Sequence, residues 1–378
     1  MKDLSDLLPP GIRCRSMDGI NGLKVHMLEA GEAGQQPCVL LVHGFPELAF
    51  SWRRIMLTLA GAGFYVVAPD QRGYGRTQGH AQGYDVDLMP WGFENLVADA
   101  VALITMLGYR EVACVVGHDF GSPLAGWCAM TRPDLFQSVA LMSAPFAGVP
   151  AALSTPSGRA PTRVGSNFND ALAGLSPARK HYHQYYASRE AAPEMADPPQ
   201  GMQAFLRGYF HAKSAHWKGN TPHTLGAMTA EALALLPTYY VMNLHESMPQ
   251  TVIPYMPDDD GSAWLAHDEL AFYAAEYTRT GFQGGLNWYR ARLAGVDAGA
   301  SARYAGKPIS VPGMFIAGAQ DWGIYQTPGA FERMPGAFAD WRGATLVENA
   351  GHWVQQEQAA AVGRALQKFL ADTRQGSR

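Results

Sequence analysis

The sequence has little cysteine, and its cysteines are not spaced for chemistry. The four of them, Cys14, Cys38, Cys114 and Cys128, include no C-x-x-C pair, and three lie in strongly apolar stretches. Such residues are typical of reduced, buried thiols, because disulfide frameworks and zinc sites need close and repeated spacings. The sequence therefore predicts neither structural disulfides nor a cysteine-based metal site.

Charge of one sign and long apolar runs are also scarce. The 29 basic and 33 acidic residues are scattered without long runs, which argues against nucleic acid or an anionic membrane as a partner. No stretch approaches the roughly 20 apolar residues of a membrane span, and the opening MKDLSDLLPPG is too acidic for a secretion signal. We expect a cytoplasmic protein, and the choice between monomer and homodimer stays open.

Motifs for bound cofactors are absent as well. The chain has no G-x-G-x-x-G and no phosphate loop, which argues against the common nucleotide sites. His211, His216 and His223 suggest a metal at first sight, but no further ligand accompanies them at a recognisable spacing. We therefore expect no metal and no cofactor.

What the sequence does contain is a series of short, valine-rich apolar runs, each followed by a loop or a helical pattern. The runs are PCVLLVHG, FYVVAPD, ACVVGHD and SVALMSAP in residues 1–145, and PGMFIAGAQD and ATLVENAGH near the C-terminus. Runs that are apolar on both faces are typical of a parallel sheet covered by helices. One covering helix is predicted from Phe93 to Leu107, where apolar residues recur at helical spacing before Gly108.

The middle of the chain differs in kind, because strand-like runs vanish and Ala, Tyr, Met, Pro and His predominate. Helix-like stretches there are 199–211, 229–243 and 267–279. We interpret residues 146–302 as a mostly helical cap domain, with 147–178 as its leading linker. The α/β core would then consist of two parts, residues 1–145 and 303–378.

The candidate site begins at GHDFGS, residues 117–122, between an apolar strand and a helical run. Many hydrolases place a serine nucleophile on such a strand-to-helix turn, and here the corresponding residue is Asp119. The small residues around it would let the nucleophile adopt a strained backbone without collisions. Taken alone, the motif also fits an ordinary loop whose aspartate caps the helix.

Two later residues stand where the partners of a nucleophile belong. In this arrangement an acid and then a histidine follow in chain order, each at the carboxyl end of a strand. Asp321 follows MFIAGAQ and His352 follows ATLVENAG, whereas no acid follows SVALMSAP. A histidine alone would more often be structural, but the ordered set predicts Asp119 as nucleophile, Asp321 as acid and His352 as base.

The loop HGFPE, residues 43–47, follows another strand and predicts the rest of the site. Backbone N–H groups of Phe45 and Phe120 are expected to form an oxyanion hole. We expect His43 to support the loop by hydrogen bonding and Pro46 to follow a cis peptide bond. Asp70, which also follows a strand, is expected to have a structural role.

An aspartate nucleophile implies a particular reaction. It displaces a leaving group at saturated carbon and forms an alkyl ester of its own side chain, which water activated by His352 would then hydrolyse. Epoxides and alkyl halides are the two obvious substrate classes. A halide leaves as a weak base, whereas an epoxide oxygen needs a proton donor such as a phenol. Tyrosines aimed at Asp119 from the cap would thus favour an epoxide.

Together with two cap segments, these motifs resemble the soluble epoxide hydrolases of the α/β-hydrolase fold. The segments are KHYHQYY, residues 180–186, and GLNWYR, residues 285–290, and the resemblance extends over about residues 10–370. HGFP and GHDFG are shared with fluoroacetate and haloalkane dehalogenases, whereas NWYR is more specific. Two departures stand out: Phe120 replaces a tryptophan of many relatives, and the cap segment 211–262 is long.

The resemblance implies that Tyr182 and Tyr289 protonate the epoxide oxygen, with Tyr185 or Tyr186 as alternatives to Tyr182. It also implies water as co-substrate and a vicinal diol as product, and the apolar cap predicts a hydrophobic epoxide. The residues assigned to the pocket wall or to loop support are His43, Pro46, Trp288 and Trp353. The alternative functions are a haloalkane or haloacid dehalogenase with the same triad and, more remotely, a non-catalytic ligand receptor.

Overall fold

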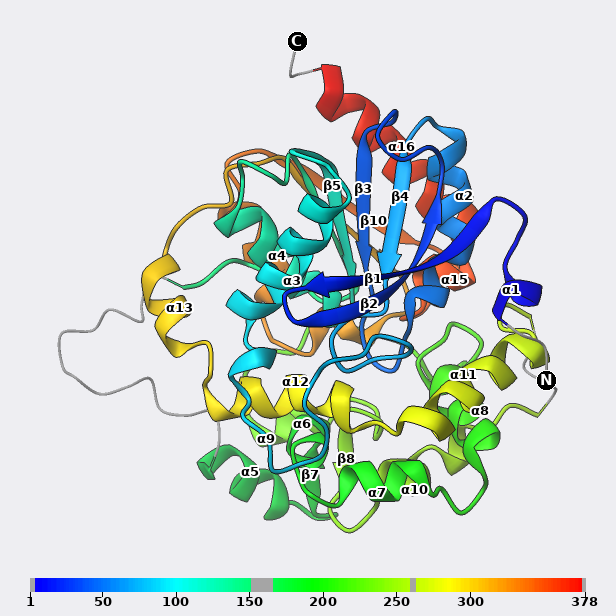
Figure 1. Cartoon of the computed structure of the whole chain (residues 1–378). Helices are drawn as coiled ribbons and strands as arrows, with labels where there is room; N and C mark the ends of the chain where they lie inside the picture. The colour runs from blue at the N-terminus through cyan, green and yellow to red at the C-terminus, as the bar shows by residue number, and fades with distance from the viewer. Residues whose placement is uncertain (1–3, 151–165, 259–262, 376–378) are drawn as a thin grey trace.

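The computed structural model describes residues 4–150, 166–258 and 263–375. An eight-stranded sheet lies at its centre in the order β1-β2-β4-β3-β5-β6-β9-β10 (Figure 1). The strands are β1 (Ile12–Ile20), β2 (Leu23–Ala30), β3 (Cys38–Val42), β4 (Tyr65–Pro69), β5 (Val112–His118), β6 (Val139–Met142), β9 (Gly313–Gly318) and β10 (Trp341–Val347). All pairings from β4 to β10 are parallel, which confirms the predicted mostly parallel α/β sheet.

The remaining pairings belong to an antiparallel hairpin at one edge. β1 pairs with β2, and β2 pairs with β4. The hairpin turns at Asn21 and Gly22, whose φ angles of 47° and 80° lie in the left-handed region that a tight two-residue turn requires. The segment DGING, residues 18–22, supplies the asparagine and the glycine of this turn.

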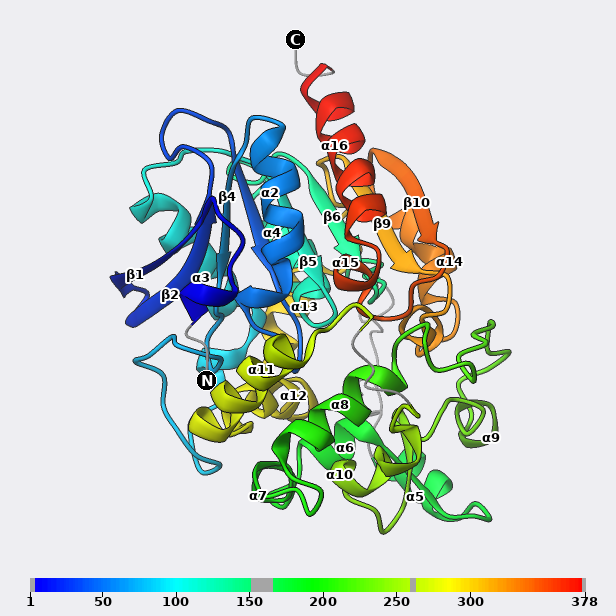
Figure 2. The same ribbon diagram turned by 90° about the vertical axis from the view of Figure 1, so that its right-hand side faces the viewer.

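Helices cover both faces of the sheet, as a parallel sheet requires. The helix α2 (Arg53–Gly61) packs on α16 (Ala359–Gln375), and α3 (Phe93–Met106) packs on α4 (Gly121–Thr131) (Figure 2). The residues of α3 that are buried include Phe93, Leu96 and Ile104, and the chain reverses after it at Gly108, with φ 85°. The predicted stripe and helix end are thus confirmed.

A mainly helical segment lies between β6 and β9 in the sequence and below the sheet in Figure 1. Its helices are α5 (Ser166–Ala173), α6 (Tyr182–Tyr186), α7 (Ala191–Ala196), α8 (Met202–Ala212), α9 (Ala230–Leu233), α10 (Met248–Thr251), α11 (His267–Thr280), α12 (Gln283–Ala294) and α13 (Ala298–Tyr304). Part of the expected linker, residues 151–165, lies outside the described residues. The helices predicted at 199–211 and 267–279 correspond to α8 and α11.

The helix predicted at 229–243 is wrong. Only the single turn α9 forms, and the chain then enters β8 (Val241–Asn243), which pairs antiparallel with β7 (Arg179–His181). Pro237 offers no N–H and fits poorly inside a helix, so the helical pattern stops before the strand. The segment is therefore not purely helical. In the described part of the chain, no helix is both long and apolar enough to cross a bilayer.

Candidate active site

Asp119 stands on the turn between β5 and α4. Its φ of 51° is unusual for a residue with a side chain, and close packing surrounds it. A Cβ at Gly117 would lie 1.9 Å from the Gly121 carbonyl oxygen, and one at Gly121 would lie 2.3 Å from that of Val42. Only glycine fits these two positions, so the sequence of small residues fixes the turn that presents Asp119.

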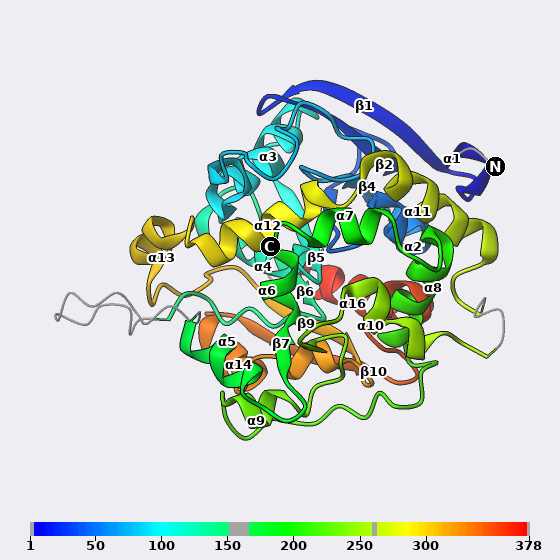
Figure 3. The same ribbon diagram turned by 90° about the horizontal axis from the view of Figure 1, so that it is seen from below.

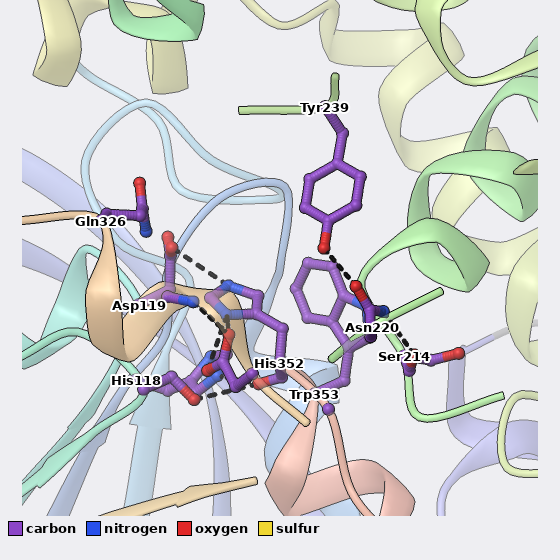
Figure 4. Close-up of polar contacts among 12 residues, drawn as sticks. His118, Asp119, Ser214, Asn220, Tyr239, Gln326, His352 and Trp353 are labelled. Atoms are coloured by element: carbon purple, nitrogen blue, oxygen red, sulfur yellow. Dashed lines mark hydrogen bonds and ion pairs between the residues drawn. The ribbon is translucent and has the colours of Figure 1, made fainter. Parts of the chain in front are cut away.

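Strands that are distant in sequence bring the three predicted triad residues together, and Figure 4 shows two of them, Asp119 and His352. Asp321 follows β9 and His352 follows β10. The Nε2 atom of His352 lies 3.2 Å from Asp119 Oδ2, and its Nδ1 atom lies 3.1 and 3.2 Å from the two Asp321 oxygens. Asp119 is 8 % exposed, and the other two residues are 1 % exposed, so the cluster is almost wholly screened from water.

The charges of this cluster support one another. Burial alone would raise the pKa of Asp119, but the hydrogen bond and charge of His352 outweigh it and hold that pKa well below its usual range. Burial would likewise lower the pKa of His352, yet the two aspartates raise it to about 9. At neutral pH the resting site therefore holds an imidazolium between two carboxylates.

The loop after β3 supplies one hydrogen-bond donor to the carboxylate. The Phe45 N–H donates to Asp119 Oδ1 over 2.9 Å, and the Phe45–Pro46 peptide bond is cis, as predicted. A Cβ at Gly44 would come within 2.3 Å of the Asp119 side chain, so glycine allows this approach. Phe120 is the N-cap residue of α4, and among the described residues its N–H makes no hydrogen bond to Asp119.

Two buried tyrosines, Tyr182 of α6 and Tyr289 of α12, come from helices that contact each other in the middle segment (Figure 3), and the charge of Asp119 acts on both phenols. The ring centroid of Tyr289 lies 5.0 Å from that of Phe120 and 6.1 Å from that of Tyr182. Burial raises the pKa of both phenols, and the charge of Asp119 raises it further, so both stay protonated. The Tyr182 hydroxyl donates to Gln326 Oε1 over 3.0 Å.

The alternative tyrosines have other partners. Tyr185 donates its hydroxyl to Glu194 Oε2 over 2.8 Å, and the hydroxyls of Tyr186 and Tyr209 share a hydrogen bond of 2.9 Å. The ring of Tyr186 lies 5.0 Å from that of Tyr289 and is nearer to it than the ring of Tyr182 at 6.1 Å, so ring contact with Tyr289 does not by itself select Tyr182 over Tyr186.

The remaining predicted residues hold loops in place. His43 Nε2 accepts from the Gln71 N–H over 3.2 Å, and the indole N–H groups of Trp288 and Trp353 donate to backbone carbonyls over 2.9 and 2.8 Å. Asp70 contacts His26 Nδ1 at 2.8 Å and accepts two backbone N–H groups, which agrees with a structural role. In the parts of the chain that are described, no cluster of histidine, cysteine and acidic residues could hold a metal.

A buried pair behind the triad escaped the sequence analysis. His118 Nε2 lies 2.7 Å from the His352 carbonyl oxygen, and its Nδ1 lies 2.5 Å from Glu47 Oε2. Burial would raise the pKa of Glu47, but His118 outweighs it and holds that pKa below the usual value. Ser143 Oγ donates to the same carbonyl over 3.1 Å, so the backbone of the base is held from two sides. Glu47 belongs to the motif HGFPE and His118 to the motif GHDFG. These two motifs were the only feature of the sequence that could have pointed to the pair.

Glu357 holds the loop of the base from its other side. Its carboxylate accepts the N–H groups of Gly351 and Trp353, each over 3.1 Å, and that of Ala215 over 2.8 Å. The His352 N–H in turn donates to the Lys213 carbonyl over 2.8 Å. One half-buried carboxylate therefore joins the loop of the base to the segment that follows α8.

Replacing Glu357 with alanine is expected to destabilise the fold. Three buried N–H groups would lose their acceptor, and at about 1–3 kcal/mol for each unsatisfied group the free energy of unfolding should fall by roughly 3 kcal/mol or more. Urea unfolding followed by tryptophan fluorescence measures the change. Glu348→Ala, which removes an exposed carboxylate nearby, is the matched control and should unfold as the parent does. Equal stabilities of the two variants would contradict this role.

Comparisons with known proteins now define the class and then the family. Residues 37–218 match the family model described as the alpha/beta hydrolase fold. The chain is 34 % identical over 355 residues to epoxide hydrolase A of Mycobacterium tuberculosis, with 93 % of this chain and 95 % of the relative covered. It is 30 % identical to an epoxide hydrolase of Caballeronia sordidicola, with 93 % and 91 % covered. The chain therefore belongs to the epoxide hydrolases.

Solved structures agree. An epoxide hydrolase from an endophytic Streptomyces superposes with a TM-score of 0.77 at 30 % identity, covering 97 % of each chain. Epoxide hydrolase A from Mycobacterium thermoresistibile gives a TM-score of 0.74 at 31 % identity, covering 95 % of this chain and 98 % of that one. The predicted fold class and the family resemblance are confirmed, and the chain is an enzyme of the hydrolase class.

Proposed function

We propose that this enzyme adds water to a hydrophobic epoxide through a covalent ester with Asp119 and releases a vicinal diol. The observation that carries the proposal is the enclosure of an ionised carboxylate, an imidazole and two protonated phenols in one buried cluster. A halide would not need the phenols, whereas an epoxide oxygen does, because it leaves as a strongly basic alkoxide.

In the first step, Asp119 Oδ2 attacks one ring carbon. A carbon–oxygen bond to the enzyme forms as the ring bond breaks, and the leaving oxygen takes a proton from Tyr289 or Tyr182. Tyr289 is the better placed donor, because the Tyr182 proton points to Gln326 in the resting site. Burial and the charge of Asp119 keep both phenols in the protonated state that this step consumes.

In the second step, neutral His352 takes a proton from water, and the hydroxide oxygen attacks Asp119 Cγ. Negative charge then develops on Oδ1, which already accepts the Phe45 N–H. The Phe120 N–H is proposed as the second donor, because Phe120 directly follows Asp119 in the chain and lies at the N-terminal end of α4. Collapse breaks the acyl–oxygen bond, and the departing alkoxide takes the proton of the attacking hydroxide to give the diol. Asp321 stabilises the imidazolium until His352 returns its proton, by way of solvent, to the tyrosine that was deprotonated in the first step.

The source of the oxygen in the product tests this route. During a single turnover in oxygen-18-labelled water, with enzyme in excess over styrene oxide, the first diol should contain no label, because its new oxygen comes from Asp119. The label should instead appear in the peptide that contains Asp119, as measured by mass spectrometry. Direct attack of water on the epoxide would place the label in the first diol and would overturn the proposal.

The two steps are expected to respond differently to pH. Alkylation should be flat from about pH 6 to 9, because the pKa of Asp119 lies far below this range. Hydrolysis should accelerate as pH rises, since it needs neutral His352. Ester formation removes the charge of Asp119 that raises the pKa of His352, so this acceleration should centre below the resting value of about 9. Stopped-flow tryptophan fluorescence separates the two rate constants, and hydrolysis that slows with rising pH would contradict the assignment.

The wider organisation is proposed on the same footing. Residues 146–302 would form the cap domain over a core of residues 1–145 and 303–378, since α6 and α12 of the middle segment carry both phenols. A cytoplasmic enzyme, as a monomer or homodimer, agrees with the free buried thiols of Cys38 and Cys114, which are typical of a reducing compartment.

A further inference from the structure

A buried lysine stands among the aromatic rings of the site and takes no part in the reaction described above. Lys213 follows α8 and is 3 % exposed. Its ammonium nitrogen lies 4.7 Å from the ring centroid of Tyr240, 5.0 Å from that of Tyr209, 5.7 Å from that of Tyr182 and 5.9 Å from that of Trp353. Among the described residues it has neither an ion pair nor a hydrogen bond on this nitrogen.

Such a position is costly for a charge. Aromatic faces attract a cation, but they offer no strong acceptor for the three N–H donors of an ammonium. Buried lysines are accordingly rare unless a carboxylate or another acceptor pairs with them. The rings around Lys213 offset part of this cost, and its charge has no anionic partner among the described residues.

The backbone around Lys213 is held firmly, so the residue is built into this position. Its carbonyl accepts the His352 N–H over 2.8 Å, and Asn220 Nδ2 donates to the carbonyls on either side, Ala212 over 2.8 Å and Ser214 over 2.7 Å (Figure 4). A Cβ at Gly351 would lie only 2.4 Å from the Lys213 carbonyl oxygen, so the two segments pack closely. The backbone of Lys213 cannot shift without disturbing the loop of the base.

The ammonium also lies close to the reacting groups. One of its ring neighbours is Tyr182, the proposed proton donor, and another is Trp353, the residue after His352. Its positive charge contributes to lowering the pKa of Asp119 and that of His352. A group that is attached to the bound epoxide and extends past Tyr182 would therefore meet it.

We propose that Lys213 determines specificity by binding a carboxylate of the substrate, so that the preferred substrates are apolar epoxides that carry one carboxylate at a distance from the ring. The inference rests on the proposed function. A carboxylate matches the single charge of Lys213, whereas a phosphate dianion would bring an excess negative charge among apolar rings. It also accepts hydrogen bonds from the ammonium, which the rings cannot do.

The test compares matched pairs of substrates. Terminal epoxides of straight-chain alkanoic acids of increasing length are assayed beside their primary amides, which have the same shape and no charge. With the parent enzyme, kcat/KM for the best acid should exceed that of its amide by about tenfold or more, in line with a hydrogen bond to a charged group. Lys213→Met should bring the ratio of kcat/KM for acid and amide close to one. The ratio is the readout, because the charge of Lys213 also acts on Asp119 and His352 and its loss can change both values together.

Lys180→Met is the matched control. Lys180 also lies over a ring, that of Tyr185 at 5.0 Å, but this tyrosine donates to Glu194 and is not a proposed donor. This variant should keep the preference for acids. Equal kcat/KM for acids and amides in the parent enzyme would overturn the proposal, and so would an equal loss for both in Lys213→Met, because the lysine would then act on the reaction itself.

Binding measurements keep the inference separate from the proposed reaction. Saturated alkanoates and their amides should compete with the epoxide, and the parent should bind the alkanoate about tenfold more tightly, again by one charge-assisted hydrogen bond. Failure of every amide and acid epoxide to turn over would refute the proposed reaction while tight alkanoate binding still supported the lysine site. If Lys213→Met does not fold, the parent enzyme still provides a test: equal affinity for the alkanoate and its amide would refute carboxylate binding by Lys213.

Discussion

Replacing His352 with glutamine is expected to stop the reaction after the first covalent bond has formed. The Phe45 N–H and the charge of Lys213 still favour the ionised form of Asp119 after the charge of His352 is lost, so ring opening proceeds, but no base remains to activate water. Incubation with an epoxide should raise the intact mass of the protein by the full mass of the epoxide, because addition expels nothing. Steady-state diol formation should fall by about 10²–10⁴, the usual contribution of a general base.

Peptide mass mapping should place this adduct on Asp119, and Asp119→Asn in the same protein should abolish it. His223→Gln is a suitable control, because His223 is an exposed histidine of the middle segment, and it should behave as the parent enzyme. An alkyl halide would instead leave a mass increase that lacks the halogen. Absence of an adduct from every epoxide would refute the covalent route, whatever the turnover of the parent.

The sheet can be predicted from the sequence because a strand that is buried on both faces consists of consecutive apolar residues. Every residue of β3, β4 and β6 is buried, and each strand therefore appears as an uninterrupted apolar run. Asp119 and Asp321 follow β5 and β9, which are buried almost throughout, whereas β10 before His352 is mostly exposed and was predicted only from the short apolar run ATLV. Carboxyl ends of parallel strands meet at one edge of a sheet, and this is why three residues far apart in sequence could be expected in one site.

The middle segment was less predictable because its pairings are not local. β7 and β8 have three residues each and lie about sixty positions apart in the sequence. Each is too short to show a strand periodicity, so their pairing could not be predicted. The supports of His352 escaped notice for a similar reason. Glu357 acts on backbone N–H groups of residues 215, 351 and 353, and a backbone donor has no sequence signature.

The two phenols carry the distinction between an epoxide and a halide, and removing them is expected to have an effect as large as removing the base. Without a proton donor the ring oxygen must leave as an alkoxide in a buried site. Each single change, Tyr289→Phe or Tyr182→Phe, should slow alkylation by about 10²-fold, within the usual range for a proton donor. Tyr289→Phe should slow alkylation more than Tyr182→Phe does, because the Tyr182 hydroxyl already donates to Gln326.

The double variant, Tyr182→Phe with Tyr289→Phe, should show no ester with any epoxide in a single-turnover experiment, whereas an alkyl bromide should still alkylate Asp119 because bromide needs no proton. Tyr185→Phe is the control for the register of the aromatic segment; its hydroxyl donates to Glu194, so the rate should match that of the parent enzyme. Ring opening at the parental rate in the double variant would mean that another group supplies the proton. Loss of bromide alkylation as well would mean that the phenols shape the site, because a pure proton donor can affect only a leaving group that needs the proton.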